Sequence, residues 1–337
     1  MFEVVFRWNA CRPDLEANDF IDKITLRGYI PQNVGLTGEF INKLRSNKIK
    51  PLSVGDITSK ICPTRRDVYY SKGPQQTTTR NIPTWGREAG KLVEQYYYDL
   101  FPRSVKTHKE KYTSIHKRAD RYSRKFFTIK EKKIIELERL EEDSDKIEGD
   151  SKWLVNIINQ SGRAEFALKI LNRFSKDSFN IDSQHVKIKT QINPKLEDTG
   201  INSPSEPDFI IPNHSLIGDI KSGSEFLKTF PLTCAGYALA YENEYHININ
   251  WGVIYFVPTH TTSNYYRAIT YPQVYFFPID ENLRTAFLNM RDRAYDIISR
   301  GDPPNFPSEN ERGNCPYCKY KDHCVSLGLQ LERENND

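Results

Sequence analysis

The sequence predicts an α/β fold, in which helices flank a β-sheet. A strand, a tight turn and a second strand run through residues 206–221. Strand composition returns at 251–257 and at 274–277. Helical patterns at 225–244 and 281–300 follow the hairpin and the last strand. Strands and helices that alternate in this way are typical of a sheet with helical layers.

The composition indicates a polar, globular chain of 337 residues, long enough for one large domain or two smaller ones. No apolar run approaches the length that spans a membrane. Residues 1–7 lack the basic and then apolar pattern of a signal peptide, so we expect a cytoplasmic protein. A net charge of +4 is too small to indicate nucleic-acid binding by itself.

The first 61 residues are expected to form an irregular arm with short helical pieces, one of them at 39–44. A lone cysteine and a basic pair, Arg65 and Arg66, follow the arm beside two tyrosines. Such a group is a candidate contact for a phosphate backbone and for stacked bases. The start of a surface helix explains the basic pair equally well.

A helix is predicted after Thr84, a good N-cap, and it should end before Pro102. A helical insertion is expected next, over 103–180. Residues 103–139 carry 13 Lys or Arg against 5 Asp or Glu, a local excess of +8. Such a basic face predicts salt-sensitive contacts with nucleic acid, although a solvated helical hairpin has the same composition. The candidate contacts are Lys117, Arg118, Arg121, Arg124 and Lys125.

The hairpin at 206–221 places two carboxylates opposite each other. If residues 213 and 214 are the centre of the turn, Asp208 faces Asp219, with Cβ atoms roughly 5 Å apart. Lys221 then shares the face of Asp219 because side chains alternate. The two acids repel each other unless a cation, such as a hard divalent ion, lies between them. The lysine can stabilise developing charge, whereas a plain hairpin would leave this face in water.

Three cysteines close the chain in C-x2-C-x5-C spacing: Cys315, Cys318 and Cys324. A CxxC pair brings two sulfurs onto one metal, so this trio predicts a metal site that needs a fourth ligand. Zinc would take His323 as a local ligand, whereas an iron–sulfur cubane would take a fourth cysteine, for which Cys62 is the candidate. The spacing leaves both alternatives open.

The order of these motifs resembles that of a known family. Cys62, the Asp208 hairpin, the tyrosine helix 236–242 and the cysteine trio follow one another as in the CRISPR-associated RecB-like exonucleases, the Cas-four family. The sequence is most similar to the archaeal subtype I-A branch. The resemblance covers residues 62–100 and 185–324.

This resemblance implies a restriction-endonuclease-like (PD-(D/E)xK) core. Its mixed central sheet would be flanked by helices and carry a helical insertion and a C-terminal iron–sulfur lid. The implied parts are an N-terminal arm at 1–61, a nuclease core at 62–102 and 181–300, the basic insertion at 103–180, and a cysteine-rich segment at 301–337.

The resemblance also implies the roles of site residues. A [4Fe–4S] cluster would be held by Cys62, Cys315, Cys318 and Cys324. Mg²⁺ or Mn²⁺ would be bound by a set that comprises Asp208, Asp219, Ile220 and, from the early helix, Glu94. Lys221 would assist the attack of water on a phosphodiester, with Tyr237 in the catalytic set. The family trims single-stranded DNA ends and works with CRISPR integrase proteins in the capture of new spacers.

Two positions depart from the family pattern. Gly90 stands where the family often has a histidine, and Thr233 stands where it has a glutamine. These departures favour an alternative function, a catalytically weak or inactive iron–sulfur DNA-binding subunit. The intact Asp208, Asp219 and Lys221 favour the nuclease. A zinc-stapled nuclease unrelated to CRISPR systems is the third reading.

Overall fold

The computed structural model describes residues 6–9, 35–59, 61–77, 187–212, 215–223, 226–258 and 273–330. The elements of the N-terminal half are β1 (Phe6–Asn9), α2 (Gly38–Arg45), α3 (Val54–Thr58) and α4 (Arg66–Lys72). Those of the C-terminal half are β2 (Lys187–Ile188), α9 (Leu196–Thr199), β3 (Phe209–Ile211), β4 (Leu216–Gly223), α10 (Phe230–Tyr245), β5 (Trp251–Pro258), β6 (Gln273–Pro278), α11 (Glu281–Ile298), the 3-10 helix η2 (Glu309–Tyr317) and α12 (Lys321–Ser326). The predicted α/β class is confirmed.

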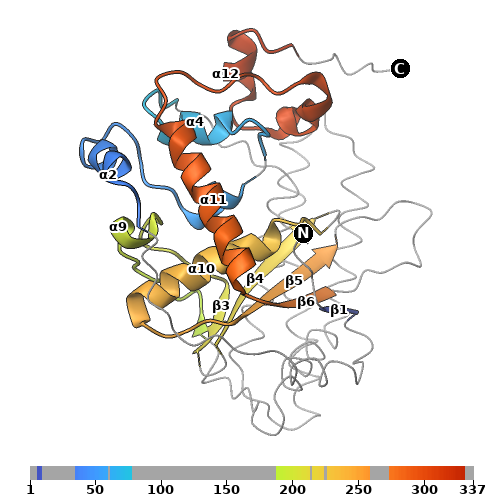
Figure 1. Ribbon diagram of the computed structural model, residues 1–337. Coiled ribbons are helices and arrows are strands. Elements are labelled where there is room, and N and C mark those ends of the chain that lie inside the picture. The colour runs from blue at the N-terminus through green and yellow to red at the C-terminus, as the bar shows by residue number, and fades with distance from the viewer. Residues whose placement is uncertain are drawn as a thin grey trace, which may run out of the picture.

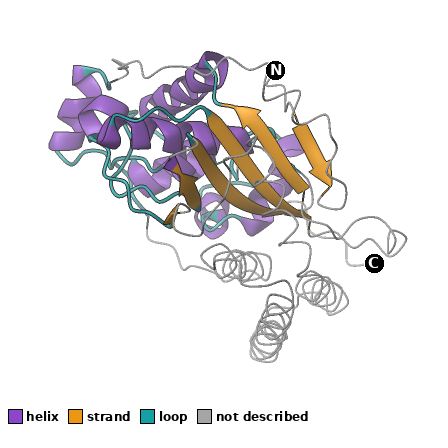
Figure 2. Ribbon diagram, turned by 90° about the horizontal axis from the view of Figure 1, so that it is seen from below, coloured by secondary structure: helices purple, strands orange, loops and turns teal. Residues whose placement is uncertain are grey.

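The described strands form one six-stranded sheet in the order β1-β6-β5-β4-β3-β2 (Figure 1). Strands β4 and β5 are parallel and the other neighbours are antiparallel, so the sheet is mixed, as predicted. Helix α10 connects the two parallel strands, as a parallel pair requires, and packs on both of them. Figure 2 shows the described helices gathered along the sheet. None of the described helices is long and apolar enough to cross a membrane.

The N-terminal arm contributes to the sheet, which the sequence did not predict. Strand β1 pairs with β6 at the edge, with Phe6 opposite Phe276. The helix expected at 39–44 is confirmed as α2. Because β1 and β6 lie at opposite ends of the chain, their pairing leaves no local pattern in the sequence of either segment.

One face of the sheet forms the main core with α10 and α11. Its strands contribute Ile210, Ile217 and Ile254, which are fully buried against residues of the two helices. Aromatic rings cover glycines on neighbouring strands. A Cβ atom at Gly218 would lie 1.9 Å from the ring of Phe209, the residue paired with it. A larger residue at 218 would therefore push β3 away from β4, and this pairing sets the position of the acidic residues described below.

Helix α11 connects the main core to a second, smaller core at the top of Figure 1. A buried ion pair fixes the end of α11 nearer the sheet to α10. Arg284 Nη1 lies 2.7 Å from Glu242 Oε2, and Arg284 Nη2 lies 2.8 Å from Glu242 Oε1. The same guanidinium donates to the carbonyl of Ile249 at 2.8 Å, and the amide of Ile249 donates to Glu242. Both charged side chains are therefore satisfied within the core.

Arg284→Met is expected to destabilise the protein by about 3–5 kcal/mol, because it leaves the Glu242 carboxylate buried without its cation. Urea unfolding measures this loss. The matched control is Arg300→Met, which removes an exposed ion pair with Asp296 on the same helix and should cost less than about 1 kcal/mol. Equal losses in the two variants would contradict this account of the core.

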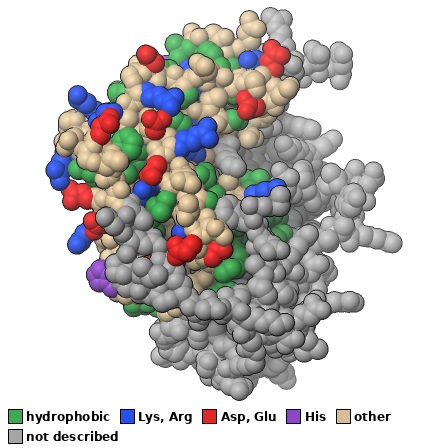
Figure 3. Space-filling model, viewed as in Figure 1, with side chains coloured by type: hydrophobic (Ala, Val, Ile, Leu, Met, Phe, Trp, Pro, Cys, Tyr) green, Lys and Arg blue, Asp and Glu red, His purple; other side chains and the backbone are tan. Residues whose placement is uncertain are grey.

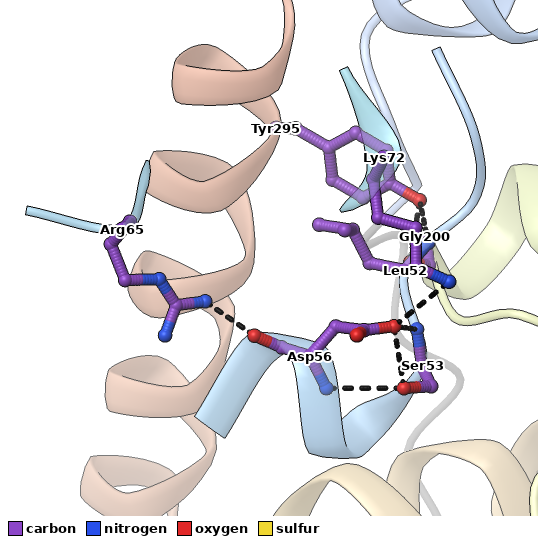
Figure 4. Close-up of polar contacts among 7 residues, drawn as sticks. All are labelled: Leu52, Ser53, Asp56, Arg65, Lys72, Gly200 and Tyr295. Atoms are coloured by element: carbon purple, nitrogen blue, oxygen red, sulfur yellow. Dashed lines mark hydrogen bonds and ion pairs between the residues drawn. The ribbon is translucent and has the colours of Figure 1, made fainter. Parts of the chain in front are cut away.

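Helix α3 is held in place by a dense set of polar contacts (Figure 4). Ser53 and Asp56 form a capping box at its N-terminus, and Asp56 also pairs with Lys72 of α4 at 3.1 Å. The hydroxyl of Tyr295 on α11 donates to the carbonyl of Gly200 at 3.0 Å and accepts from the amide of Leu52 at 3.3 Å. These contacts attach the region of α3 to α4 and α11, and α3 also packs on α10, the helix that covers the candidate site.

Candidate functional site

The β3–β4 hairpin has the predicted register. Ile210 pairs with Ile217, and the last pair away from the turn is Phe209 with Gly218. Asp208 lies directly beyond this pair, before the start of β3. The Asp208 carboxylate reaches across to β4, where it accepts a hydrogen bond of 2.5 Å from the amide of Ile220. Two acids separated by ten residues in the sequence therefore lie at one end of the hairpin.

Asp219 and Lys221 lie on the sheet face that α10 covers. Asp219 is only 3% exposed. Its Oδ2 atom lies 2.5 Å from the Lys221 ammonium nitrogen, yet this oxygen makes no well-directed hydrogen bond, so the contact is charge pairing. Burial and the nearby Asp208 raise the pKa of Asp219 to about 8, against the opposing effect of Lys221. Burial lowers the pKa of Lys221, but attraction to the two acids outweighs it and the net pKa is raised.

Helix α10 contributes Tyr237 to this site. Burial raises the pKa of the Tyr237 phenol, and the charges of Asp219 and Asp208 raise it further, so the phenol stays protonated and can donate a hydrogen bond. Cys234, one turn earlier, is fully buried, with its sulfur 3.9 Å from the carbonyl of Val253 on β5. Burial, followed by the charge of Asp219, raises its pKa. The sequence analysis had not assigned Cys234, although its spacing from Tyr237 places both on one helix face.

Thr233, one turn before Tyr237 on α10, contacts α3. Its hydroxyl oxygen lies 3.4 Å from that of Thr58, and both residues are buried. The residue at the place of the family glutamine is therefore engaged in the contact between two helices.

The hairpin and α10 thus bring together Asp208, Asp219, Lys221 and Tyr237, with Ile220 between them in the chain. Two carboxylates beside an ammonium and a phenol can bind a cation and donate to an anion. Within the residues that the structure describes, no three His, Cys, Asp or Glu side chains are arranged to hold one metal ion. Glu94, the predicted further ligand, lies outside them.

The raised pKa of Asp219 predicts a pH dependence of stability for the metal-free protein. The folded state holds a proton on Asp219 up to about pH 8, whereas the ordinary pKa is 3.8, so the free energy of unfolding should fall as pH rises from about 4 to 8. Asp219→Asn should flatten this slope. Asp67, whose pKa is raised by burial, acts in the same direction and stays in both proteins. Urea unfolding at several pH values in a chelator would contradict the prediction if both slopes were equal.

Four cysteines gather at the second core. Cys62, Cys315 and Cys324 are buried, Cys318 is partly exposed, and all four are free thiols. Burial raises the pKa of each C-terminal thiol, and the charge of Cys62 raises it further in all three cases. Cys62 therefore lies within electrostatic reach of the trio. His323, the alternative fourth ligand, packs its ring edge-on against Tyr70, with ring centroids 4.6 Å apart.

The N-terminal part of the second core is helix α4, which follows Cys62. Tyr69 and Tyr70 of α4 are fully buried against Cys315, Cys324 and Ile297 of the C-terminal part. The Tyr69 hydroxyl donates to the carbonyl of Gly301 at 2.8 Å. Segments more than 200 residues apart therefore pack around the four thiols.

The nucleic-acid contact expected at Arg65 and Arg66 stays a prediction, and both side chains have partners within the protein. Arg65 donates to the carbonyls of Asp56 at 2.5 Å and Ile57 at 3.0 Å, which caps the C-terminus of α3. Arg66 is 5% exposed, and its guanidinium lies 4.0 Å from the ring centroid of Phe306. The two tyrosines beside them are buried as well. The basic pair starts a helix, as the alternative stated, but its side chains point into the protein.

The basic insertion falls outside the described residues. This holds for Lys117, Arg118, Arg121, Arg124 and Lys125, and for the position of Gly90. On the described part of the face in Figure 3, Lys and Arg are interspersed with Asp and Glu. The basic surface predicted for the insertion stays a prediction.

Comparison with known proteins places these motifs in a family. The family model described as CRISPR-associated exonuclease Csa1 matches residues 42–326, which include the four cysteines and the hairpin. A stretch of 116 residues is 34% identical to the CRISPR-associated exonuclease Csa1 of Saccharolobus solfataricus. That alignment covers 33% of this chain and 36% of the relative, so the chain spans little more than a third of the curated relative's length. The match over 42–326 covers most of the chain, which therefore belongs to the Csa1 family of CRISPR-associated exonucleases.

Proposed function

We propose that this protein is a metal-dependent DNA exonuclease that hydrolyses phosphodiester bonds at single-stranded ends, and that it acts with CRISPR integrase proteins when new spacers are captured. Membership of the Csa1 family supports the nuclease class. The observation that carries the proposal is the pair of the buried Asp219 and the partly exposed Lys221 beside Asp208. Such a pair is costly to bury, so a fold retains it where its charges are used.

Mg²⁺ or Mn²⁺ would be held by Asp208, Asp219 and Ile220, with Glu94 completing the set. The donors fit a hard cation, because Asp219 carries a buried oxygen without a directed hydrogen bond and a proton that a cation can displace. The bound ion supplies positive charge to the phosphate and lowers the pKa of its water.

The chain's own residues do the rest. The Lys221 ammonium balances the negative charge that develops as water adds to phosphorus and the bond to the leaving oxygen breaks. Tyr237 keeps its proton and donates a hydrogen bond to a phosphate oxygen or to a bound base edge. The amide of Ile220 fixes the orientation of Asp208. The basic insertion at 103–180 would hold the DNA strand through its phosphates.

A [4Fe–4S] cluster held by Cys62, Cys315, Cys318 and Cys324 is proposed to staple the two ends of the domain. The free thiols of Cys315, Cys318 and Cys324 in one core, with Cys62 within electrostatic reach of them, support it. Zinc held by the trio and His323 is the alternative, because the cysteine spacing fits both kinds of site.

End-labelled single-stranded DNA tests the activity. The wild-type protein should shorten the labelled strand stepwise in the presence of Mn²⁺. A chelator should stop this shortening. Lys221→Ala should bind Mn²⁺ but lower the single-turnover rate by about a hundredfold or more, because its charge acts in the transition state. The matched control is Lys228→Ala, an exposed lysine of the loop before α10, which should retain the wild-type rate. A wild-type protein that binds the DNA without shortening it would contradict the proposal.

That outcome would favour the alternative, a catalytically weak or inactive iron–sulfur DNA-binding subunit of the spacer-capture complex. One observation supports this alternative. Thr233 stands at the place of the family glutamine and contacts Thr58 of α3, so this position adds no donor to the acids. Thr233→Gln should then restore or increase Mn²⁺-dependent shortening of the labelled strand.

A further inference from the structure

Arg66 is a buried cation at the cysteine core. Its side chain is 5% exposed. The guanidinium lies over the ring of Phe306, donates to the carbonyl of Pro304, and donates to the hydroxyl of Tyr70 at 2.5 Å. Burial raises the pKa of the Cys324 thiol, and the charge of Arg66 opposes this rise, so the two side chains lie within electrostatic reach of each other. These contacts fix its orientation at the edge of the cysteine core, because Tyr70 and Phe306 pack in the same cluster as Cys324.

Arg66 has no carboxylate partner among the residues that the structure describes. Its contacts there are a carbonyl, a phenol and two aromatic rings, and its Nε atom has no hydrogen-bond partner. The adjacent Asp67 has Arg65 and Lys319 as its opposite charges. Arg284, an equally buried arginine, has Glu242. An unpaired buried charge costs several kcal/mol, so Arg66 needs an anion that neutral thiols do not provide.

We propose that Arg66 is the charge partner of the cluster through the Cys324 sulfur, and that it sets the reduction potential and the retention of the cluster. This rests on the proposed [4Fe–4S] cluster. Four thiolates around a cubane carry net negative charge, which compensates the guanidinium. Positive charge and N–H···S hydrogen bonds stabilise the reduced state, so Arg66 raises the potential relative to a neutral residue.

The test compares wild type with Arg66→Met and Arg66→Lys, with Arg284→Met as the matched buried control. Iron and acid-labile sulfide are measured first. Spectroelectrochemical titration then gives the potential, and loss of metal to a chelator gives retention. Arg66→Met should shift the one-electron equilibrium toward the oxidised cluster by roughly tenfold, or about 59 mV, and should lose metal faster. Arg66→Lys, which retains the charge, should lie between it and wild type. Arg284→Met should leave the potential unchanged.

The outcomes separate the two proposals. A wild-type protein without iron and sulfide refutes the proposed cluster, and chelator kinetics of whatever metal is bound still test the charge pairing. A loaded Arg66→Met protein with the wild-type potential and the wild-type rate of metal loss overturns the role of Arg66. Equal rates of metal loss from Arg66→Met and Arg66→Lys also overturn the proposal, because the shape of arginine rather than its charge would then matter. A folded Arg66→Met protein that lacks the cluster, beside a loaded Arg66→Lys protein, supports the proposal.

Discussion

Asp208→Asn and Asp219→Asn are each expected to abolish Mn²⁺-dependent shortening of single-stranded DNA. Loss of a residue that merely supports a metal ligand costs about 10- to 100-fold, so loss of a ligand should cost about a hundredfold or more. The fold should survive, since asparagine is nearly isosteric and removes repulsion between the buried Asp219 and the partly buried Asp208. In metal-free buffer near pH 8, Asp219→Asn should unfold at a higher urea concentration than wild type.

The control for this pair is Asp296→Asn, which removes an exposed acid of α11 that pairs with Arg300. It should cut DNA at the wild-type rate. Single-turnover gel assays measure the rates, and circular dichroism checks the fold. Asn variants that cut as fast as wild type would refute the catalytic assignment and favour the DNA-binding subunit.

The hairpin was predictable because its geometry is local. A two-residue turn and a side-chain period of two fix which residues face each other, and the observed pair of Ile210 and Ile217 follows from them. Helix α11 was predictable for the same reason, from apolar residues at helical spacing. Helix α10 was also predicted, although apolar residues lie on nearly all of its sides. The contact of Asp208 with the amide of Ile220 was not, because it depends on how β3 ends.

The basic pair has partners within the protein that the sequence did not indicate. Arg65 and Arg66 looked like surface cations, since arginine is rarely buried. Their partners are the end of α3 and the aromatic ring of Phe306, some 240 residues further along the chain. The Glu242–Arg284 pair was missed for the same reason. Charges that are buried by distant partners leave no periodic signal in the sequence.

The two candidate sites are connected through α3. Arg65, three residues after Cys62, caps the C-terminus of α3. The hydroxyls of Thr58 on α3 and Thr233 on α10 lie 3.4 Å apart, and Tyr237 follows one turn later. An N-terminal segment that is held by the cluster would thus also hold the helix that covers the acids. Removal of the cluster should therefore loosen both cores.

Cys62→Ala is expected to remove the cluster and to lower the free energy of unfolding by on the order of several kcal/mol, because ligand binding is coupled to folding. The Cys62 thiol is the only one of the four that precedes the insertion, so its loss releases α4 from the C-terminal segment. Iron and sulfide content and urea unfolding, measured on anaerobically purified protein, check this result.

The matched control is Cys234→Ala, which removes a buried thiol beside the acids rather than in the cysteine core. This change leaves a small cavity and should lower the free energy of unfolding by about 1 kcal/mol, while the protein keeps its full iron content. If Cys62→Ala instead retains its metal and its stability, the trio must take a local fourth ligand. His323 is then the candidate, and the staple between the two ends of the chain is refuted. Loss of iron from both variants alike would mean that the cysteine core responds to any disturbance of the fold.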